Sequence, residues 1–309
     1  MPPRPFFEEG MPMTAGRRRA HVARGLEFFA MTAPALVAIL LFVEIPFLMS
    51  VLYSFTKWNG LDKAVKFIGI ANYAELMTTD PGFGSAMIFT LLFTVLAVAA
   101  TNVIALLLAV ILDANIRGKN VLRAAFYIPN IISLIIIGYV WRFIFSRGFD
   151  SFGALTHLGV FQLSWLGDFH LVFFSVVLVT VWQSIGFYMV IYIAGLQTVP
   201  REQIEAAVID GTGPVNRFFR ITLPLILPSV TVAVFYSLSN ALKTFDVIFS
   251  LTFGGPGTAT TSIALDIYKT AFSDSRFGYG SAKSVVLFLL ILAVTVFQLT
   301  AFKRREVQA

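Results

Sequence analysis

The chain has 309 residues, of which 57% are hydrophobic and only 13% are charged. A soluble domain is nearer to half apolar and a quarter charged, so the surplus apolar surface is predicted to face lipid. The chain has no cysteine, which excludes disulfides and thiolate metal sites, and its three scattered histidines, His21, His157 and His170, predict no metal site. The net charge of +6 is compatible with nucleic-acid binding, but its distribution indicates a membrane topology instead.

Six stretches of the sequence are long and apolar enough to cross a bilayer, whose ~30 Å hydrocarbon core takes about 20 residues. In chain order they cover residues 28–53, 85–112, 124–145, 171–196, 223–251 and 278–302. The expected fold is therefore an all-α integral membrane protein with six transmembrane helices. Residues 28–302 are expected to form one transmembrane domain, with tails at 1–27 and 303–309.

The first apolar stretch follows a basic run, Arg17-Arg18-Arg19, and this order is also found in secretory signal peptides. The stretch is far longer than the roughly 7–15 apolar residues of such a signal, and no small-x-small cleavage site closes it. An uncleaved first helix is therefore predicted. Prolines near the start of the chain predict a poorly ordered tail, while Glu44 and Pro46 are expected to mark a packing feature or a kink in the helix.

Positive charge alternates between the segments that link the apolar stretches. The two terminal tails together with residues 113–123 and 197–220 hold 14 lysines and arginines. The opposite segments and nearby helix ends hold seven, namely Lys57, Lys63, Lys66, Arg142, Arg147, Lys269 and Arg276, while Lys243 and Lys283 fall within stretches. Because positive segments remain in the cytoplasm, both termini and residues 113–123 and 197–220 are predicted to be cytoplasmic. Residues 54–84 and 252–276 are predicted to be external.

A charged island at about residues 197–222 separates the fourth and fifth stretches. Pro200 predicts the start of a helix, because its missing N–H is not needed in the first turn. Gly211 predicts the end of this helix, because glycine tolerates a positive φ, and Pro214 can open a second short helix. The apolar face of the first helix is formed by residues at helical spacing, Ile204, Ala207 and Val208.

The island carries Glu205-Ala206-Ala207, then Gly211 after three residues and Ile221-Thr222-Leu223-Pro224 after nine more. An ordinary loop helix on the membrane surface explains neither the paired alanines beside a glutamate nor the glycine. The pattern resembles the cytoplasmic coupling loop of binding-protein-dependent ABC importer permeases, which inserts into a cleft on an ATPase subunit. The resemblance carries the coupling role to Glu205, Ala206, Ala207, Asp210 and Gly211. Thr212 departs slightly from the oligosaccharide branch of that family, which commonly has alanine there.

Further segments resemble the carbohydrate branch of the family, the maltose-type inner-membrane permeases, over about residues 30–300. They are Trp58-Asn59-Gly60, Phe67-Ile68-Gly69, Asn72-Tyr73, Phe245-Asp246, Leu251-Thr252-Phe253-Gly254-Gly255-Pro256-Gly257 and Tyr268-Lys269-Thr270-Ala271-Phe272. Each is weak by itself, but their order and spacing agree with the family. The long extra external domain of some maltose permeases has no counterpart here, since the longest external segment has only about 30 residues.

Two glycine-containing segments invite comparison with nucleotide-binding loops. Gly254-Gly255-Pro256-Gly257 has no following Lys-Ser/Thr and is predicted to be external. Gly118-Lys119-Asn120 ends like a Walker A motif but has Asp113 where the first glycine belongs and Asn120 in place of Ser or Thr. The chain is therefore expected to bind no cofactor, with ATP and magnesium held by partner ATPase subunits.

Polar side chains within the apolar stretches are candidate contacts for a transported molecule, because polar and charged groups are costly in a bilayer. In the fifth stretch, Tyr236, Asn240 and Lys243 recur at three- and four-residue spacing and share a helix face with Ser239. Hydroxyl, amide and ammonium groups beside an aromatic ring suit sugars, whose hydroxyls need hydrogen-bond partners. The candidate pathway residues are Trp182, Gln183, Tyr188, Tyr236, Ser239, Asn240, Lys243 and Asp246.

Each candidate also has a structural interpretation. Polar side chains can form interhelical hydrogen bonds, and aromatic residues can anchor helices at the membrane interface. Lys243 and Asp246, three residues apart in a predicted helix, can neutralise each other as an ion pair. Three further polar residues, Thr94, Thr101 and Asn102, are expected to pack the second stretch.

The resemblance implies a permease subunit of an ATP-driven importer, in the bacterial plasma membrane, for an oligosaccharide or related carbohydrate. It also implies a second homologous permease, an ABC ATPase dimer and an extracytoplasmic solute-binding protein as partners, and no nucleic acid. No nucleophile–base set or metal cluster predicts an enzyme. Two alternatives stay open: a permease for glycerol phosphate or a glycerophosphodiester, which Lys243 would suit, and a secondary transporter. A secondary transporter would normally show internal repeats and interrupted helices and needs no docking motif.

Overall fold

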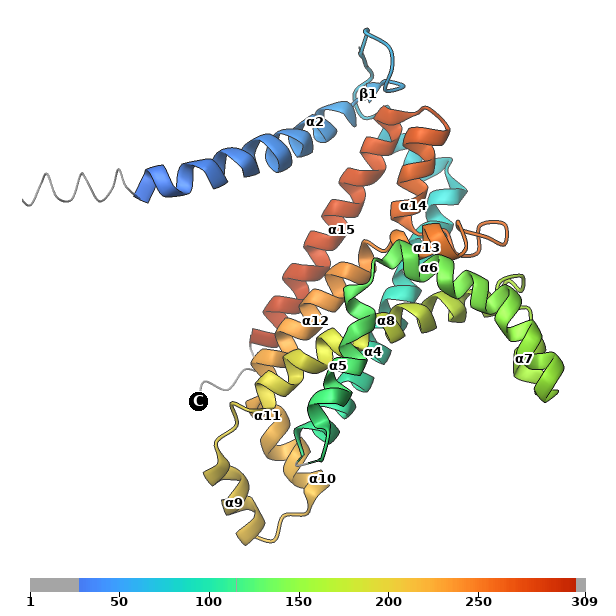
Figure 1. Ribbon diagram of the computed structural model, residues 1–309. Helices are drawn as coiled ribbons and strands as arrows, with labels where there is room; N and C mark the ends of the chain where they lie inside the picture. Colours follow the sequence, from blue (N-terminus) through green and yellow to red (C-terminus); the bar gives the residue numbers. More distant parts are fainter. Residues whose placement is uncertain (1–27, 115, 304–309) are drawn as a thin grey trace, which may run out of the picture. The chain divides into compact units, whose positions relative to one another are not determined.

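The computed structural model describes residues 28–114 and 116–303, coloured along the chain in Figure 1. The expectations for the N-terminal tail, including Arg17-Arg18-Arg19, and for residues 304–309 lie outside the described residues. The chain divides into two units, one ending at Leu52 and one beginning at Tyr53. Each unit is built from apolar helices.

A single helix makes up the described part of the first unit and continues to Tyr53, with the predicted bounds Phe28–Tyr53. Its middle is a π-helical turn, η1 (Leu40–Glu44), followed by α2 (Ile45–Tyr53). Pro46 has no N–H and its ring crowds the carbonyl four residues earlier, which accounts for a widened turn at this point. The packing feature or kink expected around Glu44 and Pro46 thus corresponds to a π turn within one continuous helix.

Two of the three longest helices of the second unit, α4 and α8, pack against each other. Helix α4 (Pro81–Asp113) begins where the Asp80 side chain accepts a hydrogen bond from the Phe83 N–H at 2.9 Å. Its last turn is capped by Arg123, which donates to the Leu112 carbonyl at 2.7 Å. Helix α8 (Leu171–Leu196) has the bounds predicted from the sequence. The aliphatic and aromatic core lies mainly between these two helices.

The third predicted span is not one straight helix. It is divided into α5 (Lys119–Ile131), α6 (Leu134–Phe143), a π turn η2 (Ile144–Gly148) and α7 (Phe149–Thr156). The two parts are bent by 96° between Ile131 and Leu134. Residues 132 and 133 have extended backbone at the break, and Pro129 has already removed one helical hydrogen bond. A short turn, η3 (Gly159–Gln162), precedes α8.

The fifth predicted span is also interrupted. It consists of α11 (Leu223–Leu225), α12 (Leu227–Leu242) and α13 (Asp246–Leu251), and it is preceded by α10 (Pro214–Arg217) and the π turn η4 (Phe218–Thr222). A bend of 74° lies at Ile226, because Pro228 supplies no N–H to continue the preceding turn. By length and composition the described residues hold four unbroken helices able to cross a membrane, or up to six if each bent pair is one span. Interrupted helices therefore do not distinguish a secondary transporter from this fold.

The segments predicted to be external join the ends of the spans. A two-stranded antiparallel hairpin, β1 (Thr56–Lys57) with β2 (Lys66–Phe67), is followed by α3 (Ala71–Thr78). The Asn72 amide donates to the carbonyls of Ser54 and Thr56 at 2.8 and 2.9 Å and so fixes the hairpin to α3. Helix α14 (Ile263–Tyr268) and the π turn η5 (Lys269–Ser273) then lead into the last span, α15 (Phe277–Lys303).

Glycines allow close contact between some of these helices, as small residues do in membrane proteins generally. A Cβ at Gly186 of α8 would collide with the Phe126 carbonyl of α5. Similarly, a Cβ at Gly138 of α6 would collide with the Ser250 side chain of α13. These contacts bring α5 close to α8 and α6 close to α13.

Candidate functional site

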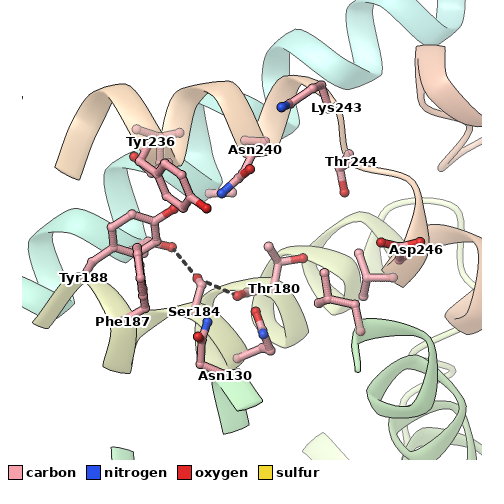
Figure 2. Close-up of a pocket in the computed structure, with 18 of the residues that line it drawn as sticks. Asn130, Thr180, Ser184, Phe187, Tyr188, Tyr236, Asn240, Lys243, Thr244 and Asp246 are labelled. Carbon is pink, nitrogen blue, oxygen red and sulfur yellow. Dashed lines mark hydrogen bonds between the residues drawn. The ribbon is translucent and has the colours of Figure 1, made fainter. Parts of the chain in front are cut away.

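A cavity of about 330 Å³ lies among α4, α5, α8, α12 and residues 243–247, which lead from α12 into α13 (Figure 2). It is bounded by both apolar and polar side chains. Its polar side chains come from each of these elements: Thr101, Asn130, Thr180, Gln183, Ser184, Tyr188, Tyr236, Ser237, Asn240, Lys243, Thr244 and Asp246. Amide, hydroxyl, phenol, ammonium and carboxylate groups are thus collected around a space within the apolar helices.

Six of the eight pathway candidates predicted from the sequence line this cavity: Gln183, Tyr188, Tyr236, Asn240, Lys243 and Asp246. Trp182 and Ser239 do not belong to the lining. Adjacent residues of a helix point about 100° apart, so Trp182 faces away from Gln183 and packs edge-to-face on Trp141, with ring centroids 5.4 Å apart. Ser239 is likewise turned away from its neighbour Asn240.

An aromatic wall forms one side of the cavity. The ring of Phe187 lies 5.3 Å from that of Tyr236 and 5.2 Å from that of Tyr188, measured between centroids. The Tyr188 and Tyr236 centroids are 6.5 Å apart. The Tyr188 hydroxyl lies beside the Asn240 amide, which points from α12 toward the same space. Aromatic rings at different tilts therefore lie next to hydrogen-bonding groups.

Five polar lining residues were not singled out by the sequence: Asn130, Thr180, Ser184, Ser237 and Thr244. Asn130, Thr180 and Ser184 lie across the cavity from α12 in Figure 2. Ser184 donates to the Thr180 carbonyl at 2.8 Å. An amide directly after Pro129 in an apolar stretch is a usable signal for Asn130, because backbone is interrupted in membranes mainly where it lines a cavity. Thr180 and Ser184 recur four residues apart on the same face of α8.

Lys243 and Asp246 do not form the ion pair that helical spacing suggested. Helix α12 ends at Leu242, and the chain is non-helical through Lys243, Thr244 and Phe245 before α13 begins at Asp246. In the part of the chain that the structure describes, neither side chain has an ion-pair partner within 4.0 Å. The ammonium and the carboxylate therefore both remain on the cavity lining, at separate positions in Figure 2.

A buried hydrogen-bond network ties together the three helices beside the cavity. The Tyr192 hydroxyl of α8 donates to Asn102 Oδ1 of α4 at 2.6 Å. Asn102 Nδ2 donates to Ser237 Oγ of α12 at 2.8 Å and to the Val98 carbonyl at 2.8 Å. Because each buried polar group here has a partner, the network stabilises the packing of the helices, as expected for Asn102.

The charged island forms the compact loop that the sequence predicted. Helix α9 (Arg201–Ile209) follows Pro200, and Gly211 has φ of +74° directly after the helix. The Thr212 N–H donates to the Ala207 carbonyl at 2.9 Å and the Gly211 N–H to the Val208 carbonyl at 3.0 Å. These two bonds are those of a Schellman motif, which ends a helix with a left-handed residue.

One assumption about this loop is corrected by the structure. Ala207 is only 5% exposed within the chain itself, so its small side chain serves packing inside the loop. Glu205, Ala206 and Asp210 are exposed. The exposed surface of α9 therefore includes Glu205 and Ala206, with Asp210 at its end, alongside Val208 and Ile209, but it does not include Ala207.

Comparisons with known proteins agree with this architecture. Residues 102–306 match the family described as the binding-protein-dependent transport system inner membrane component. The chain is 41% identical over 284 residues to a probable starch degradation products transport system permease protein, AmyD, of Thermoanaerobacterium thermosulfurigenes, covering 92% of this chain and 96% of the relative. It is 34% identical over 272 residues to the multiple sugar-binding transport system permease protein MsmF of Streptococcus mutans, covering 88% and 93%.

A solved structure shows the same fold. A chain of a bacterial ABC transporter involved in the import of the acidic polysaccharide alginate superposes with a TM-score of 0.80 at 20% identity, over 93% of this chain and 99% of that chain. The family match covers most of the second unit, including the cavity helices from Asn102 onward and the loop of α9. The chain therefore belongs to the family of inner membrane components of binding-protein-dependent transport systems, and it has the type I permease fold of ABC importers.

Proposed function

We propose that this chain is the permease subunit that passes an oligosaccharide or related carbohydrate through the membrane in an ATP-driven importer. The observation that carries the proposal is the cavity in which the aromatic wall of Phe187, Tyr188 and Tyr236 stands beside the Asn130, Gln183 and Asn240 amides. An aromatic ring covers the apolar C–H face of a sugar, while amides donate to and accept from its hydroxyls. The names of the sugar-permease relatives support the same substrate class.

The partners follow from the family and from the loop of α9. In this proposal an extracytoplasmic solute-binding protein delivers the sugar, and a second homologous permease completes the pathway. An ABC ATPase dimer binds the surface of Glu205, Ala206 and Asp210, and Gly211 allows the tight turn that holds this surface outward. The chain then needs no catalytic group of its own, since the ATPase subunits hold ATP and magnesium. Uptake that persists in proteoliposomes without the ATPase subunits would contradict this proposal and favour a secondary transporter.

Replacing Asn240 with alanine is expected to weaken sugar uptake by the assembled importer a fewfold to about tenfold, because a lost hydrogen bond costs roughly 0.5–1.5 kcal/mol. Basal ATP hydrolysis and the thermal stability of the complex should change little, since Asn240 is exposed toward the cavity and lies far along the chain from α9. Ser239→Ala is the matched control, because Ser239 is on the same helix and outside the lining. Uptake of several sugars, measured for both variants, checks the prediction.

A destabilised Asn240→Ala complex with unchanged sugar preference would show that Asn240 serves helix packing and not substrate contact. The phosphate-bearing alternative is tested with Lys243→Gln. If the substrate is a glycerol phosphate, loss of the ammonium should abolish competition by that compound. If the substrate is a neutral sugar, competition by glycerol phosphate should be weak in the parent chain as well.

The proposed topology places α9 and α10 in the cytoplasm and the hairpin of β1 and β2 outside. Asn216 of α10 is exposed, and Leu61 at the tip of the hairpin is 84% exposed. A single cysteine at Leu61 is expected to react with an impermeant maleimide in intact spheroplasts, while one at Asn216 reacts only after permeabilisation. Since the chain has no cysteine, each label reports on one position. Labelling of the cysteine at position 216 in intact spheroplasts would contradict the proposed topology.

A further inference from the structure

A buried ammonium group lies in α15, away from the cavity. Lys283 is 3% exposed, and its Nζ lies 2.8 Å from Asp80 Oδ2 and 2.7 Å from Asp266 Oδ2. It also donates to Thr270 Oγ1 at 3.0 Å. One positive charge thus joins two carboxylates that come from the start of α4 and from α14. A lysine buried in a membrane helix is costly and is retained mainly where it has a role.

The two carboxylates are held in place by different contacts. Asp80 also accepts a hydrogen bond from the Tyr279 hydroxyl at 2.8 Å and from the Phe83 N–H at 2.9 Å. Asp266 has Lys283 as its side-chain hydrogen-bond partner. Without the ammonium, Asp80 would keep two donors, whereas Asp266 would face another carboxylate with no compensating group as close.

This cluster is connected to the outer rim of the cavity, defined here as residues 244–270. Asp266 lies in α14, whose first turn is capped by Ser262. Ser262 Oγ donates to the Thr244 carbonyl at 2.7 Å, and Thr244 lines the cavity. The Ile263 N–H donates to Thr90 Oγ1 of α4 at 3.0 Å. Ile263 also packs with Phe83 and Ala86 of α4 and with Tyr279 and Leu287 of α15 in an apolar cluster. The rim is therefore attached to α4 by a hydrogen bond and by apolar packing, and Lys283 adds a charged attachment between α14, α4 and α15.

We propose that Lys283 is a positioning residue that holds the outer rim of the cavity against α4 and α15 by bridging Asp80 and Asp266 with its charge. The proposal rests on the proposed function only in that the rim borders the transport cavity. No other described side chain joins these two carboxylates by an ion pair. The bridging role requires a positive charge and not merely a long apolar stem, and this difference can be measured.

Several other charged groups surround the cluster. Arg276 Nη2 donates to both Oε1 and Oε2 of Glu75 of α3, each at 2.7 Å, and the Arg276 guanidinium lies 4.2 Å from the Tyr279 ring centroid. The positive charge of Lys269, in η5, acts to lower the pKa of Asp266. Asp274 lines the same polar pocket as Asp80, Asp266 and Lys283. Because Glu75 and Arg276 neutralise each other, the balance at Asp80 and Asp266 depends chiefly on Lys283.

The pKa shifts of Asp80 and Asp266 agree with the compensation of their charges by Lys283. Burial raises the pKa of Asp266, and the neighbouring Lys283 opposes that rise. Burial also acts to raise the pKa of Asp80, but hydrogen bonds from Lys283, Phe83 and Tyr279 outweigh it and hold the pKa below its usual range. When two carboxylates share a site without a cation, one of them takes up a proton. In a Lys283→Met variant, a proton on Asp266 can thus remove the repulsion between the two carboxylates that the ammonium otherwise compensates.

The sign of the resulting pH dependence is fixed. In Lys283→Met the pKa of Asp266 would rise further while the rim is packed against α4 and α15. This packed state would therefore bind a proton that is released when the rim separates from these helices or the chain unfolds. The packing of the rim against α4 and α15 is then stable at low pH, and this stability is lost as the pH rises through the raised pKa of Asp266. In the parent chain Lys283 contacts both carboxylates directly, so the rim should be insensitive to pH. Removing the Asp266 charge as well should remove the pH dependence.

The experiment measures exposure of the rim in the assembled importer in proteoliposomes. Each variant is made in two forms. One form has a single cysteine in place of Thr261, which is 6% exposed, and the other has a single cysteine in place of the exposed Thr258. The labelling rate at position 261 with an impermeant maleimide is divided by that at 258, which cancels the pH dependence of the thiol reaction. The ratio is determined at about pH 5.5 and about pH 8, on either side of the range in which a raised carboxyl pKa would act. Lys63→Met, which removes an exposed external charge, is the matched control.

We expect the ratio to rise about tenfold from the acid to the alkaline condition in Lys283→Met, because breaking one side of a buried ion pair leaves an uncompensated charge. The parent, Lys63→Met and Lys283→Met/Asp266→Asn should change by less than about twofold. A ratio in Lys283→Met that does not depend on pH would overturn the proposal. Failure of both Lys283 variants to assemble at every pH would also overturn it, since the lysine would then act through packing. Neither result depends on which sugar is carried.

Discussion

Replacing Ala206 with tryptophan is expected to abolish most ATP-driven uptake by the assembled importer while leaving the chain folded in the membrane. Ala206 is exposed on α9, on the side of the helix opposite to Ile204 and Val208. A large ring there leaves the loop intact but prevents close approach of another backbone. Overpacking a tight contact costs about 1–3 kcal/mol, which corresponds to roughly a fivefold to more than hundredfold loss of docking. Substrate-stimulated ATP hydrolysis and uptake are the measurements.

Ala206→Ser is the matched control, because a serine is small enough to preserve the contact surface. Ala207→Trp would be a poorer test of docking, since Ala207 is buried inside the loop and a tryptophan there would disrupt the Schellman turn itself. Normal uptake by the Ala206→Trp importer would show that this side of α9 does not bind the ATPase.

Replacing Gly186 with alanine is expected to destabilise the helix packing strongly. The added Cβ would collide with the Phe126 carbonyl, and a backbone atom of α5 cannot move aside as a flexible side chain can. Overpacking of this kind costs about 1–3 kcal/mol, and it would displace the helix that brings Asn130 to the cavity. The midpoint of thermal unfolding in detergent should fall, together with the amount of monodisperse protein.

Gly84→Ala is the matched control for this change. Gly84 is also a helical glycine, but a Cβ there would meet no atom within 4 Å. An alanine at an open helical position should be neutral or stabilise by about 0.5–1 kcal/mol. Equal effects of the two substitutions would mean that the approach of α5 to α8 does not limit stability.

The sequence determined those features that depend on composition and short-range spacing. The helices at Phe28–Tyr53 and Leu171–Leu196 have the predicted bounds, because uninterrupted apolar runs leave the backbone no partner but itself in lipid. The loop of α9 was also predictable, since Pro200 and Gly211 act on their own neighbours. The resemblance of its motif to ABC importer permeases was confirmed by the family match.

Only the tertiary structure decided how distant residues share a site. The breaks at residues 132–133 and at Ile226 turn two predicted spans into bent pairs. A separate interruption, at residues 243–245, lies between α12 and α13 and leaves Lys243 and Asp246 without an ion pair on the cavity lining, where Asn130 of α5 also lies. Composition does not reveal such breaks, because the residues on both sides stay apolar. Trp182 and Gln183 are neighbours in sequence, yet only one lines the cavity. Likewise Asp80, Asp266 and Lys283 are unremarkable as separate letters, and their meeting depends on helix packing that brings together charges nearly two hundred residues apart along the chain.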